Sequence, residues 1–162
     1  MLPLNLRSKI EERQLNIYHV FIATMLGELA VRGFINQGVV RMVISSIGEK
    51  ILEYLKNKNP RLSNISADQE GIREVIEETI KALDSFERYK VEICDQFITI
   101  AINASACKFC PRGVGGIELP GTLCIFPGLF TAVLTKALNK TFYSVTPLIK
   151  KEEWCIFKIK QG

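Results

Sequence analysis

The chain has 162 residues, of which 48% are hydrophobic, and its formal net charge is +4. This length predicts one domain with a sizeable core, and so small a charge does not indicate a nucleic-acid partner. The N-terminal residues lack a basic stretch followed by a long apolar run, and the apolar run over 17–26 is too short and too polar to span a bilayer. We therefore expect a cytoplasmic protein with no membrane span and no nucleic-acid partner.

Two helical patterns follow a polar lead-in over residues 1–14. Apolar residues recur at spacings of three and four through 17–57, interrupted only before Asn36, which is expected to cap the second helix. Gly27 and Gly48 lie inside these patterns, where glycine is costly unless it allows a close helix contact. The pattern over 17–57 therefore predicts a helical pair that forms the seam of a dimer.

The segment 66–160 is expected to contain a third helix, a sheet and a cysteine-rich loop. Ser66 begins a capping box that predicts the start of the third helix, and Pro127 opens a fourth helix. Apolar residues recur at every second position over 89–94, 97–102, 141–146 and 154–160. This alternation predicts four strands, two before the fourth helix and two after it. This order predicts an α+β fold, with an antiparallel four-stranded sheet and helices packed on one face.

Four of the five cysteines flank a glycine-rich loop or lie near the C-terminus. Cys107 and Cys110 form a Cys-x-x-Cys turn, Cys124 closes the loop and Cys155 lies in the last predicted strand. Because Zn²⁺ prefers tetrahedral thiolate ligands, these residues predict a structural zinc site with no open position for catalysis. Free buried cysteines and a redox pair remain open as alternatives.

The other candidate residues favour structural roles. Cys94 is interpreted as a packed strand residue, and His19, the only histidine, as a packed or half-exposed helix residue without a catalytic partner. No catalytic residue is predicted.

Three segments carry a resemblance to a known family: Cys-Lys-Phe-Cys-Pro-Arg-Gly-Val-Gly-Gly at 107–116, Leu-Cys-Ile-Phe-Pro-Gly-Leu at 123–129 and Trp-Cys-Ile-Phe-Lys-Ile at 154–159. They resemble archaeal members of the 4-vinyl reductase domain family. That family is similar in fold to TRAPP-complex subunits, which tether vesicles, and to the ligand domains of phenol sensors.

The resemblance implies a TRAPP-subunit-like fold, dimerisation through helices and an enclosed apolar cavity. It also implies that Cys124 and Cys155 correspond to zinc ligands of the phenol sensors, with Cys107 and Cys110 in place of the other two. Glu152 is a spare candidate ligand, because it stands three residues before Cys155.

We therefore expect a zinc-stabilised, non-catalytic homodimer that binds or senses an apolar small molecule, and a sensory role would require a separate effector protein. The cavity is expected between the third helix, the sheet and the fourth helix, although an ordinary packed core is the alternative interpretation. Two other functions remain open: a reductase acting on a tetrapyrrole vinyl group, for which no nucleotide or flavin motif is found, and a protein–protein adaptor. The predicted lining residues are Ile76, Ile80, Phe97, Phe130 and Leu134.

Overall fold

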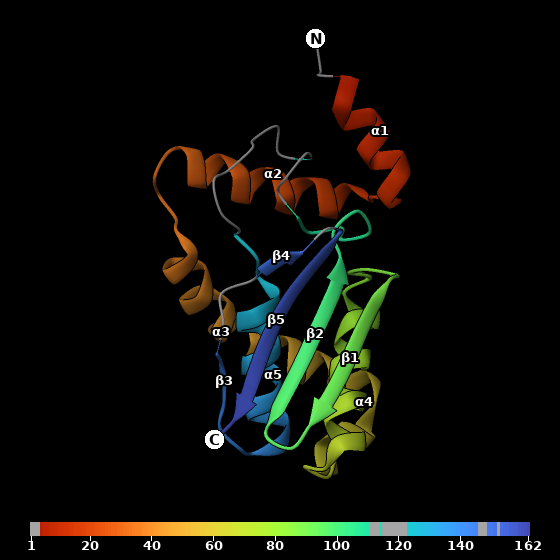
Figure 1. The fold of residues 1–162 in the computed structure, drawn as a ribbon, viewed down its shortest axis with the longest axis vertical. Helices are drawn as coiled ribbons and strands as arrows, with labels where there is room; N and C mark the ends of the chain where they lie inside the picture. The colour runs from red at the N-terminus through yellow and green to blue at the C-terminus, as the bar shows by residue number, and fades with distance from the viewer. Residues whose placement is uncertain (1–3, 111–113, 115–122, 146–148, 152) are drawn as a thin grey trace.

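The computed structural model describes residues 4–110, 114, 123–145, 149–151 and 153–162. Most helices precede the sheet in the chain, and one helix separates its two halves (Figure 1). The elements in chain order are α1 (Leu4–Arg13), α2 (Ile17–Val31), α3 (Gln37–Lys58), the 3₁₀ turn η1 (Pro60–Asn64), α4 (Gln69–Ala82), β1 (Tyr89–Cys94), β2 (Phe97–Asn103), α5 (Phe126–Leu138), β3 (Phe142–Ser144), β4 (Ile149–Lys151) and β5 (Trp154–Gln161).

The sheet is antiparallel throughout and has the order β1-β2-β5-β3, with β4 also paired to β5. Helices α4 and α5 lie behind the sheet in Figure 1, and α3 packs against α5. The α+β class, the antiparallel sheet and the helices on one of its faces are therefore confirmed. The opposite face, which is turned toward the viewer, carries none of these helices.

The edge beside β5 consists of two short strands where the sequence predicts one. Phe142 of β3 pairs with Gln161, whereas Ile149 of β4 pairs with Ile156. In an antiparallel ladder the two numbers of each pair add up to a constant, which is 303 for β3 with β5 and 305 for β4 with β5. The register against β5 therefore differs by two residues between β3 and β4. A shift of this kind interrupts the regular ladder, which is why the edge is not one continuous strand.

Side-chain caps fix where the helices begin. Asn16 accepts hydrogen bonds from the backbone N–H groups of Tyr18 and His19, and Asn36 accepts one from Val39 at 3.1 Å, as predicted. The predicted capping box at Ser66 is wrong. The N-cap of α4 is Asp68, which accepts from the Gly71 N–H at 2.8 Å, while the Ser66 hydroxyl donates to the Asp68 carboxylate.

The core fills the space between the sheet, α4 and α5, and it continues between α5 and α3. Phe130 lies between Phe126 and Phe157, with ring centroids 5.9 and 6.2 Å away. On the other side of α5, Gly48 of α3 approaches so closely that an added Cβ would stand 2.6 Å from the Ala132 Cβ. The close helix contact predicted for Gly48 therefore lies within the chain, between α3 and α5.

Candidate functional site

The N-terminal helix α2 lies across one end of the sheet (Figure 1), where it meets the segment that carries Cys107 and Cys110. His19 of α2 is 2% exposed and meets the Phe109 ring edge-on, with ring centroids 5.0 Å apart. Beside it, Ala23 packs in a small apolar cluster with Leu15 and Val114, and Val114 belongs to the loop. Phe109 and Val114 therefore tie this segment to α2.

Arg13, at the end of α1, holds the same loop from another side. Its side chain is 8% exposed, and its Nη1 donates to the Cys107 carbonyl oxygen at 3.2 Å. The Arg13 Nε is buried and has no hydrogen-bond partner among the described residues. A buried, unsatisfied donor on a cationic side chain is costly, so this position favours an anionic group next to Cys107.

Further contacts bind the loop to α3 and to the connection between α4 and β1. The buried Lys108 ammonium is 2.7 Å from the Asp84 carboxylate, and the Lys108 N–H donates to the Ser85 carbonyl oxygen at 3.0 Å. On the α3 side, the Gln37 side-chain amide donates to the Cys124 carbonyl oxygen at 3.1 Å. The backbone around two of the predicted ligands is thus fixed by elements far away in the sequence.

We call Cys107, Cys110, Cys124 and Cys155 the cysteine site. Burial, together with the charges that Cys110 and Cys155 would carry, raises the pKa of the Cys107 thiol to about 12. Burial likewise raises the pKa of the Cys124 thiol, as do Cys107, Cys110 and Cys155. The Cys107 and Cys124 thiols therefore lie within electrostatic range of Cys110 and Cys155.

Cys94 lies apart from this site. It is exposed and pairs with Phe97 beside the two-residue turn of the β1–β2 hairpin, whereas Cys155 pairs with Ile102 toward the other end of β2. The interpretation of Cys94 as a strand residue is correct, but its side chain is exposed rather than packed. It offers a natural control for experiments on the other four cysteines.

The residues of the cysteine site fit a thiophilic metal ion, because they provide four thiols. The buried Arg13 guanidinium lies next to Cys107. Zn²⁺ with four thiolates carries a net charge of −2, which the Arg13 guanidinium would partly offset. Among the described residues, no three His, Cys, Asp or Glu side chains already stand in a metal-binding arrangement. A metal would therefore have to draw the sulfurs closer together. Glu152, the spare candidate ligand, lies outside the described residues.

The predicted pocket residues are only partly brought together. Four of them belong to the buried core, namely Ile76, Ile80, Phe130 and Leu134. Phe97 is 41% exposed and lies on the opposite face of the sheet, so it does not share their surroundings. The alternation of Ile98, Ile100 and Ile102 with less apolar residues gives the physical reason, because the three isoleucines take the inward positions of β2.

Three polar residues near the site were missed by sequence reasoning: Arg13, Lys108 and Asp84. A buried Arg or Lys is rare unless it is paired, and nothing in the local sequence pattern distinguishes these residues from surface charges. The burial of Arg13 and Lys108 depends on contacts between segments that are far apart in the chain, as the Arg13–Cys107 bond shows.

None of the helices in the described part of the chain is both long enough and apolar enough to cross a bilayer. The molecule is thus an α+β protein in which α2, beyond one end of an antiparallel sheet, contacts the segment that carries Cys107 and Cys110. A family model described as the MJ0207 family matches residues 33–161, which is most of the chain. The chain belongs to the MJ0207 family.

Two relatives come from the archaeon Methanocaldococcus jannaschii. The uncharacterized protein MJ1342 is 30% identical over 93 residues, which cover 51% of this chain and 77% of that protein. The uncharacterized protein MJ0207 is 26% identical over 143 residues, which cover 88% of this chain and 86% of that protein. The resemblance to 4-vinyl reductase domains stays a prediction beside this membership.

Proposed function

We propose that this protein is a zinc-stabilised homodimer without catalytic chemistry and that it binds an apolar small molecule. The observation that carries the zinc part is the gathering of four of the five cysteines, which come from three separate segments of the chain, at one end of the sheet. Zinc would join the segment of Cys107 and Cys110 to β5 and to the start of α5. A metal bound only by the folded chain adds its binding free energy to stability.

The ligand part of the proposal is supported by the apolar interior between α4, α5 and the sheet. Ile76 and Ile80 come from α4, and Phe130 and Leu134 come from α5, and all four side chains are buried. Phe130 and its neighbours Phe126 and Phe157 fill part of this space with stacked rings. A ligand would enter by displacing these rings. Native mass spectrometry of the purified protein tests this, because a bound ligand adds a small apolar mass that is lost on unfolding.

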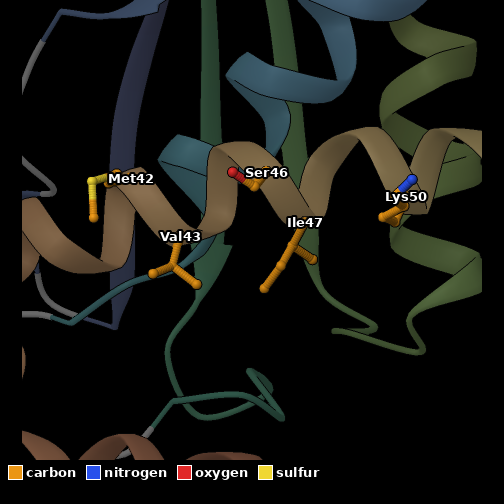
Figure 2. A pocket seen from close by; sticks show the side chains of 5 residues that line it. All are labelled: Met42, Val43, Ser46, Ile47 and Lys50. Carbon is orange, nitrogen blue, oxygen red and sulfur yellow. The ribbon is translucent and has the colours of Figure 1, made fainter.

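The dimer is supported by the apolar side chains that α2 and α3 leave exposed. Of the thirteen large hydrophobic side chains that are exposed among the described residues, ten lie within 17–54, including Tyr18 at 73% and Ile47 at 40%. Figure 2 shows Val43 and Ile47 on the same side of α3, where they line a hollow with Met42, Ser46 and Lys50. Apolar surface of this extent is typical of an interaction site, and a second copy offers the same surface in two-fold symmetry.

The zinc part is tested by comparing two cysteine variants. Cys124→Ala removes a predicted ligand, whereas Cys94→Ala removes a thiol outside the cysteine site and serves as the control. We expect elemental analysis to find one zinc per chain in the native protein and in Cys94→Ala, and much less in Cys124→Ala. Zinc at 100 times its dissociation constant stabilises a protein by about 2.7 kcal/mol, so the melting temperature of Cys124→Ala should fall by several degrees.

The same measurement can contradict the proposal. Native protein without stoichiometric metal, together with equal melting temperatures for both variants, would mean that the thiols are packed as ordinary core residues. Proposals for the zinc, the ligand and the dimer fail separately, because metal content, bound mass and oligomeric state are measured independently.

A further inference from the structure

The outer face of the sheet, on the side away from α4 and α5, collects lysines that are scattered along the sequence. Inward positions of the central strands are taken by apolar residues such as Ile100 and Phe157, which pair with each other. Because side chains alternate along a strand, the neighbouring positions face outward, and these include Lys90 of β1 and Lys158 and Lys160 of β5.

The balance of charge on this outer face is positive. The three lysines stand against a single carboxylate, Glu92, among the outward positions of β1, β2 and β5, which leaves a net charge of +2. The whole chain carries only +4, so this face holds a large share of the excess positive charge.

Aromatic rings alternate with the lysines on the same face. The Lys90 ammonium lies 5.0 Å from the centre of the Trp154 ring, and the Lys160 ammonium lies 5.8 Å from the centre of the Phe97 ring. Tyr143 of β3 pairs with Lys160 and is 42% exposed. Phe97 and Tyr143, together with Val145, are the exposed large hydrophobic residues outside 17–54 among the described residues.

The spacing of the rings along the sheet suits a chain of several units. Phe97 pairs with Lys160, which stands six residues from Trp154 on β5. At about 3.3 Å per residue, the two rings lie toward opposite ends of a face about 20 Å long. Exposed rings on an antiparallel sheet can each stack on an unpaired base, while ammonium groups beside them meet the phosphates.

We propose that the outer face of the sheet binds single-stranded nucleic acid, with bases stacking on Phe97, Trp154 and Tyr143 and phosphates meeting Lys90, Lys158 and Lys160. This inference is independent of the proposed zinc and ligand sites, and it replaces the expectation of no nucleic-acid partner. That expectation relied on the small net charge of the chain, whereas the strand pairing places these lysines on one face of the sheet. A double helix is not the expected partner, because its bases already stack on one another.

The test uses the full chain and fluorescein-labelled oligonucleotides of 15 uridines or 15 deoxythymidines. We expect saturable binding by fluorescence anisotropy, and quenching of Trp154, the only tryptophan of the chain. With three phosphate contacts, the plot of log K against log salt concentration should have a slope of about −2, because each contact contributes about −0.7 on single strands.

Two variants at exposed or half-exposed positions locate the site. Phe97→Ala should weaken binding at least fivefold, because one stacked base contributes about 1–3 kcal/mol. Lys160→Gln should reduce the salt slope by about 0.7. Lys81→Gln in the last turn of α4 removes an exposed lysine on the helical side of the sheet, so it should bind like the native protein. Unchanged melting temperatures would show that each variant is folded.

Three results would overturn the proposal. The first is no salt-dependent binding by the native protein, and the second is native affinity in both Phe97→Ala and Lys160→Gln. The third is binding to phosphatidylglycerol vesicles in the absence of oligonucleotide binding, which would assign the face to a membrane surface. A 15-base-pair duplex should bind more weakly than the single strands, and equal or tighter binding of the duplex would contradict base stacking.

Discussion

His19 links the fold of the N-terminal helices to the cysteine site. Its ring packs on Phe109, which stands between Cys107 and Cys110, and its Nδ1 accepts a hydrogen bond from the Asn16 N–H at 3.2 Å. Burial lowers the pKa of His19, and a hydrogen bond to the Leu83 backbone opposes this only in part. The folded state therefore favours the neutral imidazole, because protonation at Nδ1 would break the bond from Asn16.

This residue predicts a loss of stability in acid. The pKa of His19 is lower in the folded state than its ordinary value of 6.5, so the unfolded chain binds more protons as the pH falls below that value. The stabilisation is complete above pH 6.5 and is lost as the pH falls through the folded pKa. Melting temperatures at pH 7.5 and 5.0 check this, and the native protein should lose more on acidification than His19→Leu.

Both samples contain excess zinc, so that protons compete with zinc for the cysteine thiolates to the same extent in the native protein and in His19→Leu. Because His19 is the only histidine, no other imidazole contributes to the difference. Equal losses in the native protein and in His19→Leu would contradict the role given to the buried neutral ring.

At the scale of elements, α3 is unusual because it is apolar on two adjacent sides. Val40, Ile44 and Leu52 are buried on one side, where the helix packs on α5, and Val43 and Ile47 form an exposed stripe beside them. A helix with so wide an apolar surface needs a second partner. The exposed stripe is the physical basis for proposing that α3 lies at a dimer interface. The buried side of the helix, in turn, packs closely on α5.

Gly48 fixes the distance between α3 and α5. Gly48→Ala would raise helix propensity by up to about 1 kcal/mol, but its Cβ would overlap the Ala132 Cβ at 2.6 Å. Overpacking of this kind costs about 1–3 kcal/mol, so we expect net destabilisation in urea unfolding.

Gly128→Ala is the matched control from the same interface, because its Cβ would meet Ile44 at an ordinary 3.5 Å. That variant should be as stable as the native protein or more stable. A Gly48→Ala protein that is more stable than the native protein would contradict the close packing of the two helices.

The elements that could be predicted from the sequence are those with a strong local signal. The alternation over 89–94 and 97–102 and the cap at Asn36 act over a few residues, and the structure confirms them. The start of α4 was missed by two residues because Ser66 and Asp68 are both good caps. Phe97 was assigned to the interior on its apolar character alone, although its alternation with the isoleucines of β2 places it outside.

At the scale of the whole molecule, spacing of the cysteines in the sequence indicates a common site, but it does not reveal how the site is held. The Arg13–Cys107 and Gln37–Cys124 hydrogen bonds join residues 94 and 87 positions apart. Contacts at such separations leave no periodic signal in the sequence. The docking of α1 and α2 on the loop could therefore be seen only in the folded structure.

The proposed dimer relies on the apolar surface of α2 and α3. Ile47→Glu places a charge in the exposed stripe of α3, and burying that charge in an interface would be costly. Light scattering after size-exclusion chromatography should show twice the chain mass of 18.3 kDa for the native protein and a single chain for this variant.

Ser45→Glu, at an exposed polar position of the same helix, serves as the control and should remain dimeric. A native protein that elutes as a single chain would mean that a different molecule covers α2 and α3. A dimer that survives Ile47→Glu would place the interface elsewhere.

The central claim is that one zinc ion joins the four cysteines of the site. X-ray absorption at the zinc K-edge of the purified, zinc-loaded protein measures the ligands directly. We predict four sulfur scatterers at about 2.3 Å and no oxygen or nitrogen in the first shell. A shell of mainly oxygen and nitrogen at about 2.0–2.2 Å, or a protein that retains no zinc after dialysis, would contradict it.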